Sequence, residues 1–216
     1  MRIRKKPHTE EKLQNFSAFV TLESIGEERK GTWRKFFCED LSRELHVELG
    51  TGKGDFICAL AEKNPDKNFL GLEVEKEVVL KAARKVQEKN LSNVRLAVFD
   101  INKISEIFSD GEIDRLYINF CDPWPKKKHA KRRLTYKSFL EMYRKILKSG
   151  GEIHFKTDNR GLFDFSLEQF AEVGFEVRDV TFDLHTNEPV ENIRTEYENK
   201  FSAQGFKINR CVVVVK

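Results

Sequence analysis

The chain has 216 residues, of which 39% are hydrophobic and 34% are charged, and its net charge is +4. This length suffices for one substantial core, and the longest apolar run, residues 212–215, is far too short to span a membrane. No CxxC pair and no apolar segment after the basic N-terminus are found, so we expect a soluble, cytoplasmic protein with free thiols and no secretory signal.

Residues 1–44 read as an N-terminal extension that precedes the main domain. It begins with a basic head, Arg2 to Lys6, which is either a solvated tail or an arm that touches phosphates. Apolar residues further on predict one helical face and then a segment that docks on the main domain. These residues are Leu13, Phe16, Phe19 and Val20, followed by Trp33, Phe36 and Phe37.

From residue 45 to residue 216 the pattern alternates between strand and helix. Strands are predicted at 45–49, 68–73, 94–98, 113–120, 152–156, 175–184 and 207–215. Helices are predicted after residue 54, at 74–89, near 101–108, at 134–147 and at 162–173, with Gly150 and Gly151 ending the fourth. This alternation predicts an α/β fold with a mostly parallel, seven-stranded sheet, and the last two strands form an antiparallel pair at one edge.

The first strand leads into a loop with three alternate glycines, Glu48-Leu49-Gly50-Thr51-Gly52-Lys53-Gly54. A phosphate-binding loop would need Ser or Thr after the lysine, and a dinucleotide loop would need glycine where Asp55 stands. Glu48 would repel a pyrophosphate, whereas it suits a ligand with hydroxyls, amines or a sulfonium. The pattern resembles the first motif of S-adenosylmethionine-dependent methyltransferases, although glycines that serve only the turn remain an alternative.

Five successive strands end in or just before a carboxylate: Glu48, Glu73, Asp100, Asp122 and Asp158. In parallel sheets, ligands bind beyond the carboxyl ends of the strands. An acid about 20 residues after a glycine loop suits ribose hydroxyls, which is the role we expect for Glu73. Asp100 would then lie near the adenine and Glu48 near the methionine part of an adenosyl ligand.

The fourth strand runs into a rigid loop, Asp122-Pro123-Trp124-Pro125, that carries an acid and a large aromatic. It resembles the [DN]-P-P-[FY] loop of methyltransferases that act on base or amide nitrogens. A basic run follows at once, and its position beside the predicted crevice favours contact with RNA phosphates over a merely solvated face. The run consists of Lys126, Lys127, Lys128, Lys131, Arg132 and Arg133.

Taken together, these motifs resemble one family closely, over nearly the whole chain. They are the glycine loop, Asp122 to Lys127, Lys131 to Leu134, Lys156-Thr157-Asp158-Asn159 and Thr195-Glu196-Tyr197-Glu198. The family is that of the bacterial tRNA (guanine-N7-)-methyltransferases. The resemblance implies a Rossmann-like class I methyltransferase fold with helices on both faces of the sheet. It also implies methyl transfer from S-adenosylmethionine to N7 of guanine 46 in the tRNA variable loop.

The resemblance also implies roles for single residues. Asp122 matches the catalytic position. Cofactor-binding positions are Glu48, Gly50, Gly52, Glu73, Asp100 and Asp122, and substrate-binding positions are Lys126, Asp158, Thr195, Glu196, Tyr197 and Glu198. Two of these matches have a structural alternative, because Asp158 could cap the helix that begins near Arg160 and Thr195-x-x-Glu198 fits a capping box.

Two other functions are alternatives to tRNA methyl transfer. A non-catalytic RNA-binding protein on the same scaffold is the main alternative, but it would be expected to have lost at least one of the four cofactor acids. A small-molecule methyltransferase has no use for six clustered cations. The histidines His8, His46, His154 and His185 show no ligand spacing, so we predict no metal. The oligomeric state, monomer or homodimer, is left open.

Overall fold

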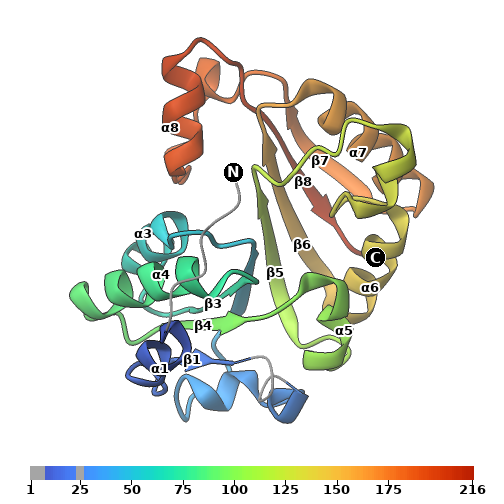
Figure 1. Ribbon diagram of the computed structural model, residues 1–216. Coiled ribbons are helices and arrows are strands. Elements are labelled where there is room, and N and C mark those ends of the chain that lie inside the picture. The colour runs from blue at the N-terminus through green and yellow to red at the C-terminus, as the bar shows by residue number, and fades with distance from the viewer. Residues whose placement is uncertain (1–7, 23–26) are drawn as a thin grey trace. The chain divides into compact units, whose positions relative to one another are not determined.

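The computed structural model describes residues 8–22 and 27–216. The chain divides into two compact units, Met1–Ser109 and Asp110–Lys216, each of which is described by itself (Figure 1). The basic head at Arg2 to Lys6 lies outside the described residues. Within the described part of the chain, no helix is both long enough and apolar enough to cross a membrane. The domain boundary expected at residue 44 stays a prediction.

The first unit contains four parallel strands in the order β1-β4-β3-β2. They are β1 (Val20–Thr21), β2 (Leu45–Leu49), β3 (Asn68–Glu73) and β4 (Val94–Val98). The predicted ranges of the last three are confirmed. Every residue of β2 is buried, as expected for a strand inside a covered parallel sheet.

The two longer helices of the first unit pack against these strands. The longer ones are α3 (Asp55–Lys63) and α4 (Lys76–Glu88), which lie side by side in Figure 1. Shorter ones are α1 (Thr9–Gln14), α5 (Ile104–Ile107) and the 3-10 turns at Glu27–Arg29, Trp33–Phe36 and Ile101–Lys103. In α4 the buried residues Val79, Ala82, Ala83 and Val86 recur at helical spacing.

The N-terminal segment is part of the core of this unit. Leu13, Phe16 and Val20 are buried in one cluster with residues of α3, α4 and the strands. The single helical face predicted for residues 13–20 is wrong, however, because α1 ends at Gln14 and Val20 opens β1, which pairs with β4. Trp33 is fully buried, and its indole N–H donates to the carbonyl of Ile107 at 2.7 Å, so its predicted docking is confirmed.

The second unit contains four strands in the order β5-β6-β8-β7. They are β5 (Ile113–Asn119), β6 (Leu147–Thr157), β7 (Glu176–Thr181) and β8 (Asn209–Val214). β5 and β6 are parallel, and β8 runs antiparallel to both β6 and β7. The antiparallel pair at the edge is therefore confirmed. The described residues hold eight strands instead of the predicted seven, because the short β1 carries no alternating pattern of its own.

Helices of the second unit are α6 (Lys137–Ile146), α7 (Arg160–Glu172) and α8 (Glu196–Ala203), with 3-10 turns at Lys127–Arg132 and Leu184–Asn187. No helix was predicted between the last two strands, so α8 corrects that expectation. The helix is short and its only buried residue is the charged Glu198, so its sequence has no apolar stripe that would predict a helix.

The two glycines at 150 and 151 do not end α6, contrary to the prediction. Leu147 already belongs to β6, and both glycines lie within that strand. The β5–β6 register shifts between Ile113 and Arg115, which pair with Leu147 and Glu152. Gly150 has φ 75, and a Cβ on Gly151 would lie 2.8 Å from the carbonyl oxygen of Lys148. The glycines therefore permit an irregularity that residues with a Cβ would resist.

Leu13→Ala tests whether the N-terminal segment belongs to the core of the first unit. Leu13 is 1% exposed, so its truncation should lower the free energy of unfolding by about 2–5 kcal/mol. Urea denaturation measures the change. Leu41→Ala, at a side chain that is 49% exposed, is the matched control and should be close to neutral. Equal stability of the two variants would contradict the burial of this segment.

Candidate active site

The glycine loop between β2 and α3 forms an open cradle. Gly50 and Gly52 have φ 75 and φ 57, and a Cβ at either position would meet no atom within 4 Å. The backbone N–H groups of Gly50 and Thr51 donate to the carbonyl of Leu72 on β3, both at 2.9 Å, and hold the loop against the neighbouring strand. The open side of these glycines is where a ligand can approach the backbone without meeting a side chain.

Glu48 is buried beneath this loop and is 4% exposed. Its Oε2 accepts a hydrogen bond of 2.6 Å from the hydroxyl of Thr51. Thr51 fits here only because residue 71 on β3 is a glycine. A Cβ at Gly71 would lie 2.9 Å from both Oγ1 and Cγ2 of Thr51. One glycine in the neighbouring strand therefore makes room for the residue that orients the first acid.

Glu73 and Asp100 follow at the ends of the next two strands. The Glu73 carboxylate accepts from the backbone N–H of Gly52 at 3.2 Å, and from those of Val74 and Glu75 at 2.9 and 3.1 Å. Asp100 accepts from the backbone and side-chain amides of Asn102 through Oδ1. Because β2, β3 and β4 pair in parallel, the structure brings these two acids and Glu48 to one edge of the sheet in the first unit.

The loop at Asp122 begins where β5 ends, in the second unit. Two of its non-glycine residues have positive φ, Phe120 at 51° and Trp124 at 40°. Arg133 clamps the loop, because its guanidinium donates to the carbonyls of Pro123 and Trp124 at 3.0 and 3.1 Å. The Asp122 side chain itself is exposed. The loop is thus held in a strained shape while its acid stays accessible.

The basic run that follows is not uniform in its surroundings. Five of its six cations are exposed: Lys126, Lys127, Lys128, Lys131 and Arg132. The Arg132 guanidinium lies over the Trp124 ring at 4.9 Å. Arg133 is half-buried, with its guanidinium 4.3 Å from the centre of the Phe165 ring. This guanidinium is the group that bonds the loop at Asp122. RNA contacts at all six positions stay predictions, and Arg133 has an additional, structural role that the sequence did not indicate.

The four cysteines are free thiols, as predicted. Cys121 stands next to Asp122, where burial raises the pKa of its thiol to about 12 and the neighbouring carboxylate adds to the shift. Burial likewise raises the pKa of Cys58 and of Cys211 to about 12. These thiols stay protonated at neutral pH and are not nucleophiles.

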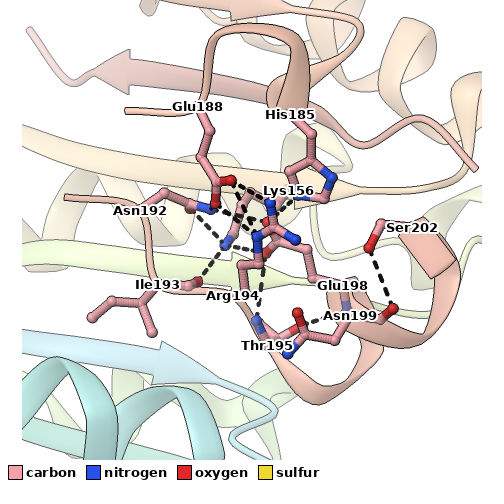
Figure 2. A network of polar contacts seen from close by, with 10 residues as sticks. All are labelled: Lys156, His185, Glu188, Asn192, Ile193, Arg194, Thr195, Glu198, Asn199 and Ser202. Atoms are coloured by element: carbon pink, nitrogen blue, oxygen red, sulfur yellow. Dashed lines mark hydrogen bonds and ion pairs between the residues drawn. The ribbon is translucent and has the colours of Figure 1, made fainter. Parts of the chain in front are cut away.

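The predicted substrate segment, residues 195–198, is the first turn of α8 and its cap. Thr195 and Glu198 form the capping box that was the structural alternative, and this is confirmed. Glu198 is fully buried and pairs with Lys156 of β6 at 2.6 Å (Figure 2). Tyr197, by contrast, is 56% exposed. The cap proposed for Asp158 is wrong, because Asn159 is the N-cap of α7 and accepts from the N–H of Leu162 at 2.8 Å.

One group with the spacing of a metal site occurs in the described residues. Nitrogen and oxygen atoms of His185, Glu188 and Glu198 lie within 4.8 Å of one another. Cationic side chains already bond both carboxylates, Lys156 at Glu198 and Arg194 at Glu188. The absence of a metal stays a prediction.

Sequence reasoning missed the residues that support the predicted acids. Thr51 and Gly71 orient Glu48, and Arg133 clamps the loop at Asp122. A lone glycine in the apolar strand 68–73 was the available signal, since such a glycine marks a close approach. Nothing in the sequence pairs Lys156 with Glu198, because the two residues are 42 positions apart.

A family model described as a putative methyltransferase matches residues 42–211 of this chain. A tRNA (guanine-N(7)-)-methyltransferase of Macrococcus caseolyticus is 45% identical over 97% of this chain and 98% of its own length. The enzyme of the same name from Brevibacillus brevis is 46% identical over 99% of this chain and the whole of its own. The chain belongs to the bacterial tRNA (guanine-N7-)-methyltransferase family.

Solved structures similar to this family member show the fold. A 16S rRNA methyltransferase, KamB, has a TM-score of 0.61 at 12% identity and covers 80% of this chain and 88% of its own. A SAM-dependent methyltransferase from Aquifex aeolicus has a TM-score of 0.55 at 15% identity and covers 89% of this chain and 98% of its own. The fold is the α/β methyltransferase fold that the sequence predicted.

Arg133→Lys tests the clamp on the loop at Asp122. Lysine keeps the charge but lacks the fork that reaches two carbonyls at once. Hydrogen bonds from a charged donor contribute about 1.5–3 kcal/mol, so the free energy of unfolding should fall by about this amount. Quenching of Trp124 fluorescence by acrylamide should increase, since the only other tryptophan, Trp33, is fully buried. Arg178→Lys, on exposed β7, is the control and should leave quenching unchanged.

Proposed function

We propose that this protein transfers a methyl group from S-adenosylmethionine to N7 of guanine 46 in the variable loop of tRNA. The observation that carries the proposal is the open glycine loop with three strand-end acids beside it, Glu48, Glu73 and Asp100. It is supported by relatives that share 45–47% identity with nearly the whole chain and are named tRNA (guanine-N(7)-)-methyltransferases. The proposal places the protein in the cytoplasm, with tRNA as its partner.

The residues of the first unit fit S-adenosylmethionine. The space above Gly50 and Gly52 admits a ligand against the backbone. Glu73 is held by three N–H groups, and each carboxylate oxygen has two lone pairs, so it can still accept from ribose hydroxyls. Asp100 would accept from the adenine amino group and Glu48 would face the methionine end. The bound cofactor supplies an activated methyl group on a positive sulfonium, to which an acidic site is complementary.

The acceptor atom, guanine N7, reacts without being deprotonated by the protein. Guanine N7 carries an unprotonated lone pair in the major groove, so its attack on a methyl group needs no general base. The protein has to align N7, methyl and sulfur, and to stabilise the positive charge that moves onto the purine. In the proposal Asp122 does so by accepting hydrogen bonds from N1–H and N2–H of the guanine. The strained loop clamped by Arg133 orients this exposed carboxylate.

Binding of tRNA would rest on the exposed cations next to this loop. Lys126, together with Asp158, Glu196 and Tyr197, is proposed to contact the substrate at the target nucleotide, whereas Thr195 and Glu198 of the same predicted segment are buried in the capping box. The remaining cations would bind phosphates, which positions the RNA without reading its sequence. The RNA-binding role of a non-catalytic scaffold is not favoured, since the cofactor acids Glu48, Glu73, Asp100 and Asp122 are all present.

Methyl transfer from labelled S-adenosylmethionine to unmodified bulk tRNA tests the proposal directly. Digestion to nucleosides should yield 7-methylguanosine as the labelled product. A tRNA transcript with guanine 46 replaced by adenine is the matched control and should accept no label. Label in another nucleoside, or undiminished label in the control transcript, would contradict the proposed acceptor, and binding of tRNA without transfer would favour the non-catalytic alternative.

Asp122→Asn tests the role of the carboxylate in catalysis. Loss of its charge should lower kcat by roughly 10²–10³-fold, as removal of an electrostatic stabiliser does in other enzymes. The Kd for S-adenosylmethionine, measured by calorimetry, should change far less. Asp179→Asn, at an exposed position of β7 with φ 50, is the control and should keep wild-type kinetics. Near-normal turnover of Asp122→Asn would show the assignment to be wrong.

A further inference from the structure

We propose that Lys156 and Glu198 are positioning residues: their buried ion pair holds α8 so that Tyr197 presents its ring to the RNA, and Glu198 itself touches no substrate. This inference rests on the proposed function, and it revises the substrate contact expected for Glu198. It concerns residues of the second unit only (Figure 2).

The Glu198 carboxylate has no room for a substrate. Its Oε2 accepts from Lys156 Nζ at 2.6 Å and from the backbone N–H of Thr195 at 3.4 Å. Its Oε1 lies 2.9 Å from Nε2 of His185 and accepts from the amide of Asn192 at 3.0 Å. A carboxylate offers about four acceptor sites, and the side chain is 0% exposed. All its bonding capacity is therefore used inside the protein.

Lys156 is equally committed. Its ammonium group donates to Glu198, to the carbonyl of Ile193 at 2.9 Å and to the side-chain oxygen of Asn192 at 3.2 Å. Burial acts to raise the pKa of the Glu198 carboxyl, but the charge of Lys156 and the hydrogen bonds from Lys156, His185 and Asn192 outweigh it, so the pKa lies below its usual range. The pair stays charged at neutral pH, so either partner left alone would be an uncompensated buried charge.

What the pair positions is an aromatic stack. The ring of Tyr197 lies 6.2 Å from that of Phe201 at an interplanar angle of 21°, and Phe201 lies 6.5 Å from Phe120 at 17°. Phe120 begins the loop that carries Asp122, and its backbone N–H donates to the carbonyl of Lys156 at 2.9 Å. Lys156 thus holds both ends of the stack, Phe120 through its backbone and α8 through its side chain.

The outer end of this stack suits a nucleobase. Tyr197 is 56% exposed, whereas Phe201 is half-buried behind it with the Lys200 ammonium 5.6 Å from its ring centre. Every base has an apolar face that stacks on an aromatic ring, and such a contact changes affinity by roughly 10- to 100-fold. The occupant is a base of the tRNA, placed by α8 beside the loop that carries the catalytic acid.

A double-mutant cycle separates positioning from contact. Lys156→Met should raise the KM for tRNA by roughly 10-fold or more, because it leaves Glu198 unpaired. Adding Glu198→Gln removes the stranded charge, so the double variant should regain at least about half of the loss on a logarithmic scale. A double variant no better than Lys156→Met, or a wild-type KM in Lys156→Met, would overturn the proposal.

Two further measurements guard against misfolding as the cause. The Kd for S-adenosylmethionine should stay at the wild-type value in Lys156→Met, in Glu198→Gln and in the double variant. Asp114→Asn breaks another ion pair of the second unit, in which Asp114 is 8% exposed but Lys148 is 47% exposed, and should leave the KM for tRNA unchanged. If Lys156→Met does not fold, Tyr197 decides: Tyr197→Ala should raise the KM for tRNA by roughly 10-fold, and Tyr197→Phe, which keeps an aromatic ring, should raise it less. Equal KM values for these two variants would overturn the proposal.

The formation of 7-methylguanosine by the wild-type protein distinguishes an error in the proposed function from an error in this inference. If the wild-type protein formed no 7-methylguanosine, the function itself would be wrong, whatever the variants did. If the wild-type protein formed it and the double variant showed no recovery, the function would stand and Glu198 would act by contact.

Discussion

Parallel pairing of neighbouring strands is the constraint on which the cofactor side of this protein depends. β2, β3 and β4 run in the same direction, so their carboxyl ends lie at the same edge of the sheet. Glu48, Glu73 and Asp100 gather there although 25 and 27 positions separate them in the chain. The loop above them is held by hydrogen bonds to β3, which makes the neighbouring strand part of the site.

The cofactor acids Glu48 and Glu73 are held in place differently from Asp122, and this difference matches their proposed roles. Glu48 is buried and fixed by Thr51, while Glu73 is fixed by three backbone N–H groups. Asp122 is exposed on a loop that is rigid by other means, with prolines on both sides of Trp124 and a guanidinium clamp. Glu48, the buried acid, is proposed to face the cofactor, whereas an acid that meets an incoming base has to stay accessible.

The Lys156–Glu198 pair shows that a residue within a family motif can be committed to contacts inside the protein. The capping box and the ion pair use the carboxylate completely, and in our proposal Glu198 therefore acts on the RNA only through Tyr197 and Phe201. Buried ion pairs are weak evidence of added stability but strongly penalise the loss of one partner. Such a pair therefore favours one position of α8 over others.

Local patterns in the sequence were enough to predict much of the fold. The ranges 45–49, 68–73 and 94–98, the glycine loop and the antiparallel edge followed from apolar runs, glycine spacing and alternation. Element ends were less well predicted: the apolar pattern of 134–147 ran from α6 into β6, because periodicity alone does not separate a helix end from the strand that follows.

The sequence by itself determined the α/β class, the acids at the strand ends, the loop at Asp122 and the family. Only the tertiary structure decided what holds these residues. Thr51 fits against Gly71, Arg133 clamps the loop at Asp122, and Glu198 pairs with Lys156. These contacts join residues that are 9 to 42 positions apart. No local pattern encodes such contacts, because they arise only when distant segments pack together, and packing rather than periodicity selects the partner of a buried charge.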